Sequence, residues 1–169
     1  MVDSWHLEPG YIQLLDERVQ EALDSLPRDH ATDATVIFSA HSLPTAILKS
    51  GDPYPQQLEE TAAAVAGRAG LSKWTTAWQS AGATDQPWIG PDLLEVLEKL
   101  AADGNRAVVV CPCGFVSDHL EVLYDVDIEA AGKAAELDMS FARTRSPNAD
   151  LEFITTLAAV VRKALPEVA

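Results

Sequence analysis

The sequence has few basic residues. Lys and Arg together number 12, against 26 Asp and Glu, which gives a formal net charge of -14 at pH 7. Proteins that bind nucleic acids or anionic membranes need a basic surface, so both classes are disfavoured. An acidic surface can attract a cation, although acidity most often serves only to keep a protein in solution.

Long apolar segments are also lacking. No apolar run approaches the roughly 20 residues that a membrane-spanning helix needs. The opening stretch, MVDSWHLEPG, is acidic and lacks the basic and apolar regions of a signal peptide. From these observations we expect a cytoplasmic protein without a membrane span.

Cysteine is scarce, and the two cysteines, Cys111 and Cys113, stand together in the triplet CPC. A disulfide across one residue would be strained, so the pair indicates neither a redox compartment nor a metal site. The sequence also has no glycine-rich phosphate loop and no Gly-x-Ser-x-Gly elbow. Nothing therefore points to nucleotide binding or to a serine hydrolase.

The apolar pattern alternates between helical and strand-like periods in a chain of 169 residues, long enough for one domain with a core. Short apolar runs predict strands over 35–40, 73–80, 106–112 and 139–145. Helical spacing predicts helices over 9–26, 54–69 and 91–104, from within 115–129 to about Leu137, and from Asn148 onward. The segments 27–33 and 41–55 are predicted as loops. This alternation implies an α/β fold, with a parallel sheet of these four strands covered on both faces.

Three residues are expected to mark helix ends. Gly70 closes the second helix, Pro91 begins the third, and Asn148 is the candidate cap of the last. In parallel sheets of this kind, ligands bind beyond the carboxyl ends of the strands. That rule selects His41, Gln79–Ser80 and the Cys111–Asp118 turn.

His41 directly follows the apolar strand TVIFSA. A neutral imidazole there could ligate a metal or accept a proton near pH 7. The alternative is a structural histidine that bonds only to its own loop.

The segment FVSDHLEVLYDVDIE, residues 115–129, gathers five carboxylates and no Lys or Arg. On a helix, Glu121, Asp125 and Glu129 share one face, Asp118 joins them three residues before Glu121, and Asp127 points elsewhere. The ordinary interpretation is a solvated acidic face. The alternative is a track for a divalent cation such as Fe(II), for which oxygen and imidazole ligands are suitable.

The apolar residues between these carboxylates should then pack inward. They are Leu120, Leu123 and Tyr124.

Several motifs of this chain resemble ferrochelatase, in the same order and spacing. They are SAHSLP (39–44), GDPYPQQLEET (51–61), WQSAG (78–82), PWIGPDL (87–93), GFVSDHLEVLYDVDIE (114–129) and PNADLEFI (147–154). The details are most similar to bacterial, actinobacterial-type coproporphyrin ferrochelatases. The resemblance covers essentially the whole chain, but only the carboxyl-terminal domain of the family.

The resemblance implies a lyase that inserts Fe(II) into a porphyrin, coproporphyrin III or protoporphyrin IX, in heme synthesis. It implies one chelatase-like, Rossmann-like domain over residues 1–169, with 1–30 as a helical entry segment, and two such domains around a porphyrin cleft in the complete enzyme. His41 corresponds to the metal-site histidine, and Glu121 to its partner carboxylate. Asp125 and Glu129, with Asp118 from the periodicity, would form a metal or proton path. Ser80 and Trp88 correspond to positions that line the porphyrin cleft.

Some members of this bacterial branch carry a [2Fe–2S] cluster on four cysteines. Here Ser117 stands where some relatives have cysteine, and two thiols cannot supply four ligands. We therefore expect no cluster, with Fe(II) entering only as the substrate metal.

The resemblance also implies a partner that completes the cleft, either a separate amino-terminal half or a second copy. Two alternatives remain open: a non-catalytic half-enzyme that binds metal or porphyrin, and a homodimeric chelatase for another tetrapyrrole. The choice of porphyrin, the oligomeric state and the division of roles between His41 and the carboxylates do not follow from the sequence.

Overall fold

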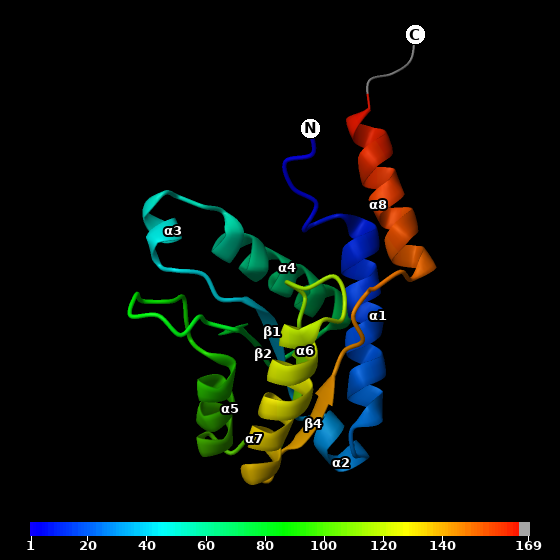
Figure 1. Ribbon diagram of the computed structural model, residues 1–169. Helices are drawn as coiled ribbons and strands as arrows, with labels where there is room; N and C mark the ends of the chain where they lie inside the picture. The colour runs from blue at the N-terminus through cyan, green and yellow to red at the C-terminus, as the bar shows by residue number, and fades with distance from the viewer. Residues whose placement is uncertain (166–169) are drawn as a thin grey trace.

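The computed structural model describes residues 1–165, and its centre is a parallel sheet (Figure 1). The strands are β1 (Thr35–His41), β2 (Trp74–Gln79), β3 (Ala107–Cys111) and β4 (Ser140–Arg143). They lie in the order β2-β1-β3-β4, and every neighbouring pair is parallel. The predicted four-stranded parallel sheet is confirmed.

Helices connect the strands and flank the sheet. They are α1 (Pro9–Ser25), α2 (Arg28–Ala31), α3 (Ala46–Lys49), α4 (Tyr54–Ala69), α5 (Leu93–Ala102), α6 (Leu120–Tyr124), the π-helix η1 (Asp125–Ala130), α7 (Ala131–Glu136) and α8 (Leu151–Ala164). The last three before β4 follow one another without a break. The short helices α2 and α3 lie in segments predicted as loops, because four residues are too few to show a helical period.

The two faces of the sheet carry separate apolar clusters. Val36 and Phe38 of β1 pack with α1 and α4 on one face, and Phe153 of α8 joins that cluster. Ile37 of β1 and Val110 of β3 pack on the other face with α5, η1 and α7. Since successive strand residues point to opposite faces, this alternation produces the predicted three-layer α/β sandwich. Helix α1 is a full member of one layer rather than only an entry segment.

Helix ends are fixed by specific residues. Gly70 ends α4 in the left-handed conformation, with a φ of 66°, as expected. Helix α5 begins at Leu93 rather than Pro91, because the side chain of Asp92 accepts a hydrogen bond from Leu94 N in a capping box with Glu95.

The last helix begins later than predicted, at Leu151, and Asp150 is its first flanking residue. Asn148 is therefore not its cap. Its side-chain oxygen instead accepts from the backbone N of Asp118 at 2.9 Å, and its amide donates to the Asp118 carboxylate at 2.9 Å.

The helical run from α6 to α7 buries small residues at every fourth position. They are Val122, Val126, Ala130 and Ala134, each fully buried. A spacing of four residues is slightly more than one turn of an α-helix and slightly less than one turn of the wider π-helix. Because α6, η1 and α7 combine both kinds of turn, the two deviations offset each other and the row stays on the side of the sheet.

The larger apolar residues of the same run face outward, contrary to the prediction that they pack inward. Leu120, Leu123 and Tyr124 are 78%, 45% and 47% exposed. The helix carries two apolar rows, and the row of smaller side chains is the one that fits against the sheet.

Within residues 1–165, no helix has the length and apolar character needed to span a bilayer.

Candidate metal site at the sheet edge

The carboxyl ends of β1 and β2 and the loop after β3 meet at one edge. His41 ends β1 and is paired in register with Gln79 at the end of β2. The loop after β3 lies on β1, because Gly114 N donates to Ser39 O at 3.0 Å. A Cβ at Gly114 would lie 2.4 Å from the Cβ of Ala40, so this close approach requires glycine.

The imidazole of His41 is oriented by its own loop and faces a carboxylate. Its Nδ1 donates to the backbone oxygen of Ser42, and its Nε2 lies 3.4 Å from Oε1 of Glu121. A carbonyl only accepts, so Nδ1 carries the hydrogen, and Nε2 of the neutral ring holds the free lone pair. The Tyr54 hydroxyl also donates to His41 O at 3.1 Å. His41 thus bonds to its own loop and still presents a ligand atom.

Glu121 lies in the first turn of α6, where the helix dipole favours a negative charge. Its second oxygen is 3.9 Å from Nδ1 of His119, the residue that precedes the helix. The Phe115 ring lies beside both histidines, at 6.3 Å from His41 and 5.0 Å from His119 between centroids. Among the described residues, no group of three or more His, Cys, Asp or Glu side chains gathers closely enough to hold a metal. The edge therefore offers two facing ligands rather than a closed cage.

Asp125 and Glu129 continue along the helical run from Glu121. Asp125 accepts from the Ser80 hydroxyl, and both carboxylates line a cavity of about 230 Å³ with Asp92. Burial raises the pKa of Asp92, the Leu94 N–H bond opposes this, and the charges of Glu95 and Asp125 raise the pKa further. The cavity wall is thus acidic and disfavours further negative charge.

Ser80 and Trp88, predicted to line a porphyrin cleft, lie on the segment after β2. Ser80 has a φ of 61° and turns its hydroxyl toward Asp125. The indole of Trp88 donates to Thr84 at 3.0 Å and packs on Gly82, where a Cβ would lie 2.6 Å from the ring. Trp88 also bridges to Pro44, so it stands beside the loop that follows His41.

Asp118 lies outside the acidic row, and its predicted place there is wrong. It precedes α6, so it has no helical register with Glu121. Its carboxylate accepts from Ser146 at 2.8 Å, Asn148 at 2.9 Å and Arg143 at 3.2 Å. The hydrogen bond from Asn148, followed by those from Ser146 and the Arg143 cation, holds the pKa of Asp118 below its usual value despite partial burial.

Asp127 points away from the row, as predicted. Its carboxylate accepts from Arg143 Nε at 2.5 Å and Nη2 at 3.1 Å.

Cys111 and Cys113 are free thiols and both are buried. Contact with Cys111 and burial raise the pKa of the Cys113 thiol well above its ordinary value, so Cys113 is a protonated packing residue. That no iron–sulfur cluster forms stays a prediction.

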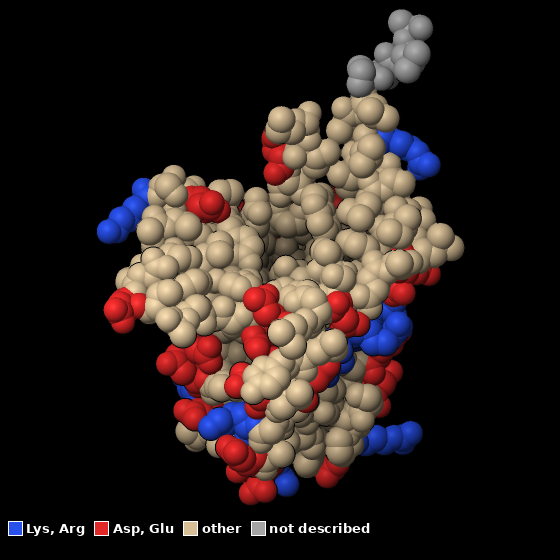
Figure 2. Space-filling model, viewed as in Figure 1, with Lys and Arg blue, Asp and Glu red and all other residues tan. Residues whose placement is uncertain are grey.

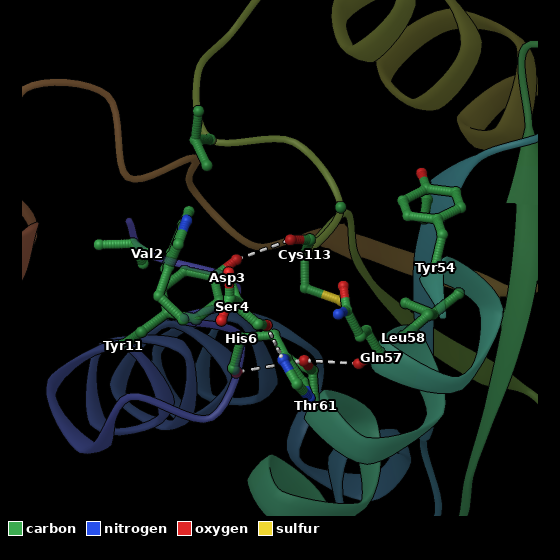
Figure 3. Close-up of a pocket in the computed structure, with 14 residues that line it drawn as sticks. Val2, Asp3, Ser4, His6, Tyr11, Tyr54, Gln57, Leu58, Thr61 and Cys113 are labelled. Carbon is green, nitrogen blue, oxygen red and sulfur yellow. Dashed lines mark hydrogen bonds between the residues drawn. The ribbon is translucent and has the colours of Figure 1, made fainter. Parts of the chain in front are cut away.

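A larger pocket, of about 320 Å³, lies beside the His41–Glu121 pair rather than at it. Figure 2 shows the hollow below the N-terminal segment, next to α4. In Figure 3, Tyr11 donates to Cys113 O at 2.6 Å across the pocket, and Thr61 is linked to His6 and Gln57. Neither His41 nor Glu121 lines it.

Two residues at the edge had no role assigned from the sequence. The side chain of Gln79 hydrogen-bonds to Ser39 of β1 and to the backbone oxygen of Glu121 in α6. The Tyr54 hydroxyl donates to the backbone oxygen of His41. The sheet-edge rule already selects the position of Gln79, and a glutamine that ends the strand WTTAWQ could also have indicated a buried polar contact.

The family model described as Ferrochelatase matches residues 1–165 of this chain. The ferrochelatase of Deinococcus radiodurans is 48% identical over 170 residues, which cover 99% of this chain and 54% of that protein. The coproporphyrin III ferrochelatase of Bacillus subtilis is 46% identical over 165 residues, covering 97% of this chain and 53% of that protein. The chain thus spans about half the length of the curated relatives it matches.

Two solved structures share the fold at low sequence identity. The cobalamin-biosynthesis protein CbiX of Marinobacter aquaeolei is 14% identical with a TM-score of 0.55, covering 78% of this chain and 96% of that one. The multi-domain protein DR2241 of Deinococcus radiodurans is 16% identical with a TM-score of 0.58, covering 95% of this chain and 30% of that one. These matches confirm a chelatase-type fold.

Proposed function

Since the chain belongs to the ferrochelatase family, we propose that it supplies the metal-binding half of a chelatase that inserts Fe(II) into coproporphyrin III or protoporphyrin IX. The observation that carries the proposal is the facing pair of His41 Nε2 and Glu121 Oε1, 3.4 Å apart at the ligand edge of the sheet.

The chemistry needs a metal that is held and then released. Fe(II) is the substrate here, and imidazole nitrogen and carboxylate oxygen both suit it. Two protein ligands leave the other coordination positions to water and to the pyrrole nitrogens, so the metal can pass onward.

Insertion also releases two protons, because the free porphyrin carries two pyrrole N–H groups that the metal replaces. Glu121, Asp125 and Glu129 are the acceptors we assign, since they form a continuous acidic row from the metal pair to the cavity shared with Asp92. The same row would guide the cation inward. Asp118 is left out of the path because Arg143, Ser146 and Asn148 already engage it.

Ser80 and Trp88 are assigned to the porphyrin side of the site. Their place after β2, beside the acidic row and the loop after His41, supports this assignment. The indole of Trp88 is half-buried, and the part of its ring that solvent reaches could stack on a flat conjugated ring.

A partner is part of the proposal, and we assign it as an amino-terminal half like that of the longer relatives. The outward apolar residues Leu120, Leu123, Tyr124 and Ile128 support it, because they form an exposed apolar surface beside Glu121. The predicted cytoplasmic location belongs to the same proposal.

The test is anaerobic Fe(II) insertion into each porphyrin, by this chain alone and mixed with a separately expressed amino-terminal half of the Deinococcus radiodurans ferrochelatase. His41→Ala and Glu121→Gln should each lower the rate by at least about 100-fold. The matched control is Asp127→Asn on the same helix, which should keep the rate within a few-fold. Near-normal rates in either site variant would refute the assignment.

Porphyrin binding without insertion, at every partner ratio, would instead favour a non-catalytic half-enzyme. Activity of the chain alone with a dimer mass in solution would favour a homodimeric chelatase, and competition with Co(II) and Ni(II) would then identify its metal.

A further inference from the structure

Gln79 joins the two elements that carry the facing pair, and no role is yet assigned to it. It is 2% exposed and neighbours His41 in the β1–β2 ladder. Its side-chain Oε1 accepts from the hydroxyl of Ser39 at 2.8 Å, and its Nε2 donates to the backbone oxygen of Glu121 at 3.1 Å. Ser39 is itself fully buried and stands two residues before His41.

The backbone of Gln79 makes a third connection. Its carbonyl accepts from Ser42 N at 2.7 Å, and the carbonyl of Ser42 is the acceptor that orients His41 Nδ1. One residue of β2 is therefore bonded on both sides of His41 and to the residue that presents the opposing carboxylate.

The amide orientation of Gln79 follows from its partners. A hydroxyl can donate to Oε1, and a carbonyl can only accept, so Nε2 must face Glu121. The Glu121 carbonyl also accepts from the helix N–H of Asp125 and so uses both of its lone pairs. All these groups are buried or half-buried, so losing one bond leaves a polar atom without a partner.

We propose that Gln79, held by Ser39, is a positioning residue that sets the distance between His41 Nε2 and Glu121 Oε1 by tying the first turn of α6 to the end of β1. The inference deepens the proposed function and rests on it for the identity of the metal. His41 and Glu121 come from separate elements, and within residues 1–165 the carboxylate of Glu121 pairs only with His41 and His119, so neither Lys nor Arg holds it in place. The amide bridge supplies a neutral link that leaves both ligand atoms free.

The experiment uses the full chain and Co(II) alone as the metal probe, titrated optically under anaerobic conditions. Gln79→Met keeps the length of the side chain and removes both side-chain bonds. It should weaken Co(II) binding by about 10- to 100-fold, the usual range for residues that orient metal ligands. Ser39→Ala removes one bond of the same bridge and should weaken binding by roughly 5-fold.

The matched control is Thr35→Val. Thr35 is also buried on the same strand and donates to Asn105 at 2.9 Å, at the opposite end of the sheet. It should lower the melting temperature as Ser39→Ala does and change Co(II) affinity by less than about 2-fold. Equal weakening by Thr35→Val would mean a general loss of structure and would overturn the proposal.

A crystal structure of Gln79→Met supplies a readout that needs no metal. The proposal requires the His41 Nε2–Glu121 Oε1 distance to grow beyond the 3.4 Å of the parent chain. An unchanged distance would overturn it. If the parent chain bound Co(II) no better than His41→Ala, the proposed function would fail separately, and this distance alone would decide the role of Gln79.

Discussion

Two sets of carboxylates within residues 115–129 lie in opposite surroundings. Asp118 and Asp127 share the guanidinium of Arg143, which comes from β4. Within residues 1–165, the carboxylates of Glu121 and Asp125 contact only neutral or titratable side chains: Glu121 faces His41 and His119, and Asp125 accepts from Ser80. Acidic side chains gather over this part of the molecule in Figure 2. Of these five neighbouring carboxylates, two thus stabilise the fold through Arg143, and the other three stay available to bind a cation or a proton.

The division follows from which side of the helical run each residue occupies. The side chain of Arg143 is only 16% exposed and lies on the β4 side of η1. It therefore pairs with Asp127 and with Asp118 in the loop before α6. Glu121 and Asp125 lie on the side of β1 and β2, where His41 and Gln79 end their strands and Ser80 follows β2. A chain selected only for stability would place a cation on that side as well.

The largest effect is expected from removing Arg143, the cation that Asp118 and Asp127 share. Arg143→Met keeps much of the stem and leaves Asp118 and Asp127 without their charged partner. Charged hydrogen bonds contribute about 1.5–3 kcal/mol each, and the exposure of Asp118 and Asp127 to solvent reduces that, so we expect about 2 kcal/mol less unfolding free energy. Urea unfolding at pH 7 measures it.

The control for that variant is Arg162→Met, on the exposed face of α8, which should change stability by less than about 0.5 kcal/mol. Co(II) affinity should stay within about 2-fold in both variants, since Arg143 touches only the stabilising set. A loss of metal binding in Arg143→Met without one in Arg162→Met would show that the two sets are coupled.

A smaller effect on the free energy of unfolding, about 1 kcal/mol or less, should distinguish the two sets of carboxylates by its dependence on pH. The folded pKa of Asp118 is depressed, so its charge stabilises the fold above the unfolded value near 3.9 and this stabilisation fades as pH falls through the folded pKa. Asp118→Asn should therefore melt at a lower temperature than the parent at pH 7, and the gap should narrow as the pH falls below the unfolded value near 3.9. A gap that stays constant over this range would contradict a stabilisation that depends on the charged form of Asp118, held by Asn148, Ser146 and Arg143.

Most of the fold could be predicted from the sequence, because strands such as TVIFSA and RAVVVCP have no solvated face and the helices between them are long. What failed was the orientation of one helix. Leu120, Leu123 and Tyr124 have larger side chains than Val122 and Val126, yet the row of smaller side chains packs on the sheet. Hydrophobicity alone ranks side chains by size, whereas the space above β3 and β4 decides which row fits.

The meeting of His41 and Glu121, the pair proposed to bind the metal, was predictable in part. His41 ends β1, and the turn after β3 that leads to Glu121 reaches the same edge of the sheet, so topology brings the two segments together. The error over Asp118 came from extending the helix two residues too early, which assigned it a register that it lacks. Gln79 could not be assigned a role, because its bonds join Ser39 and Glu121, residues far apart in sequence, through contacts that no local pattern records.

The smallest expected effect is a change in stability whose sign differs between the two sets of carboxylates. Asp125→Asn combined with Glu129→Gln removes two like-charge pairs four residues apart along the run, each costing about 0.2–0.5 kcal/mol. Both lie beyond the first turn, where the helix dipole no longer compensates them. The double variant should therefore be more stable by about 0.5 kcal/mol at low ionic strength, with most of the gain lost in 1 M salt. Asp127 lies two residues from both Asp125 and Glu129. Asp127→Asn should instead destabilise the fold, because it removes the ion pair with Arg143. If both variants shifted the urea midpoint in the same direction, the three available carboxylates would be ordinary surface charges, and the proposed acidic path would lose its physical basis.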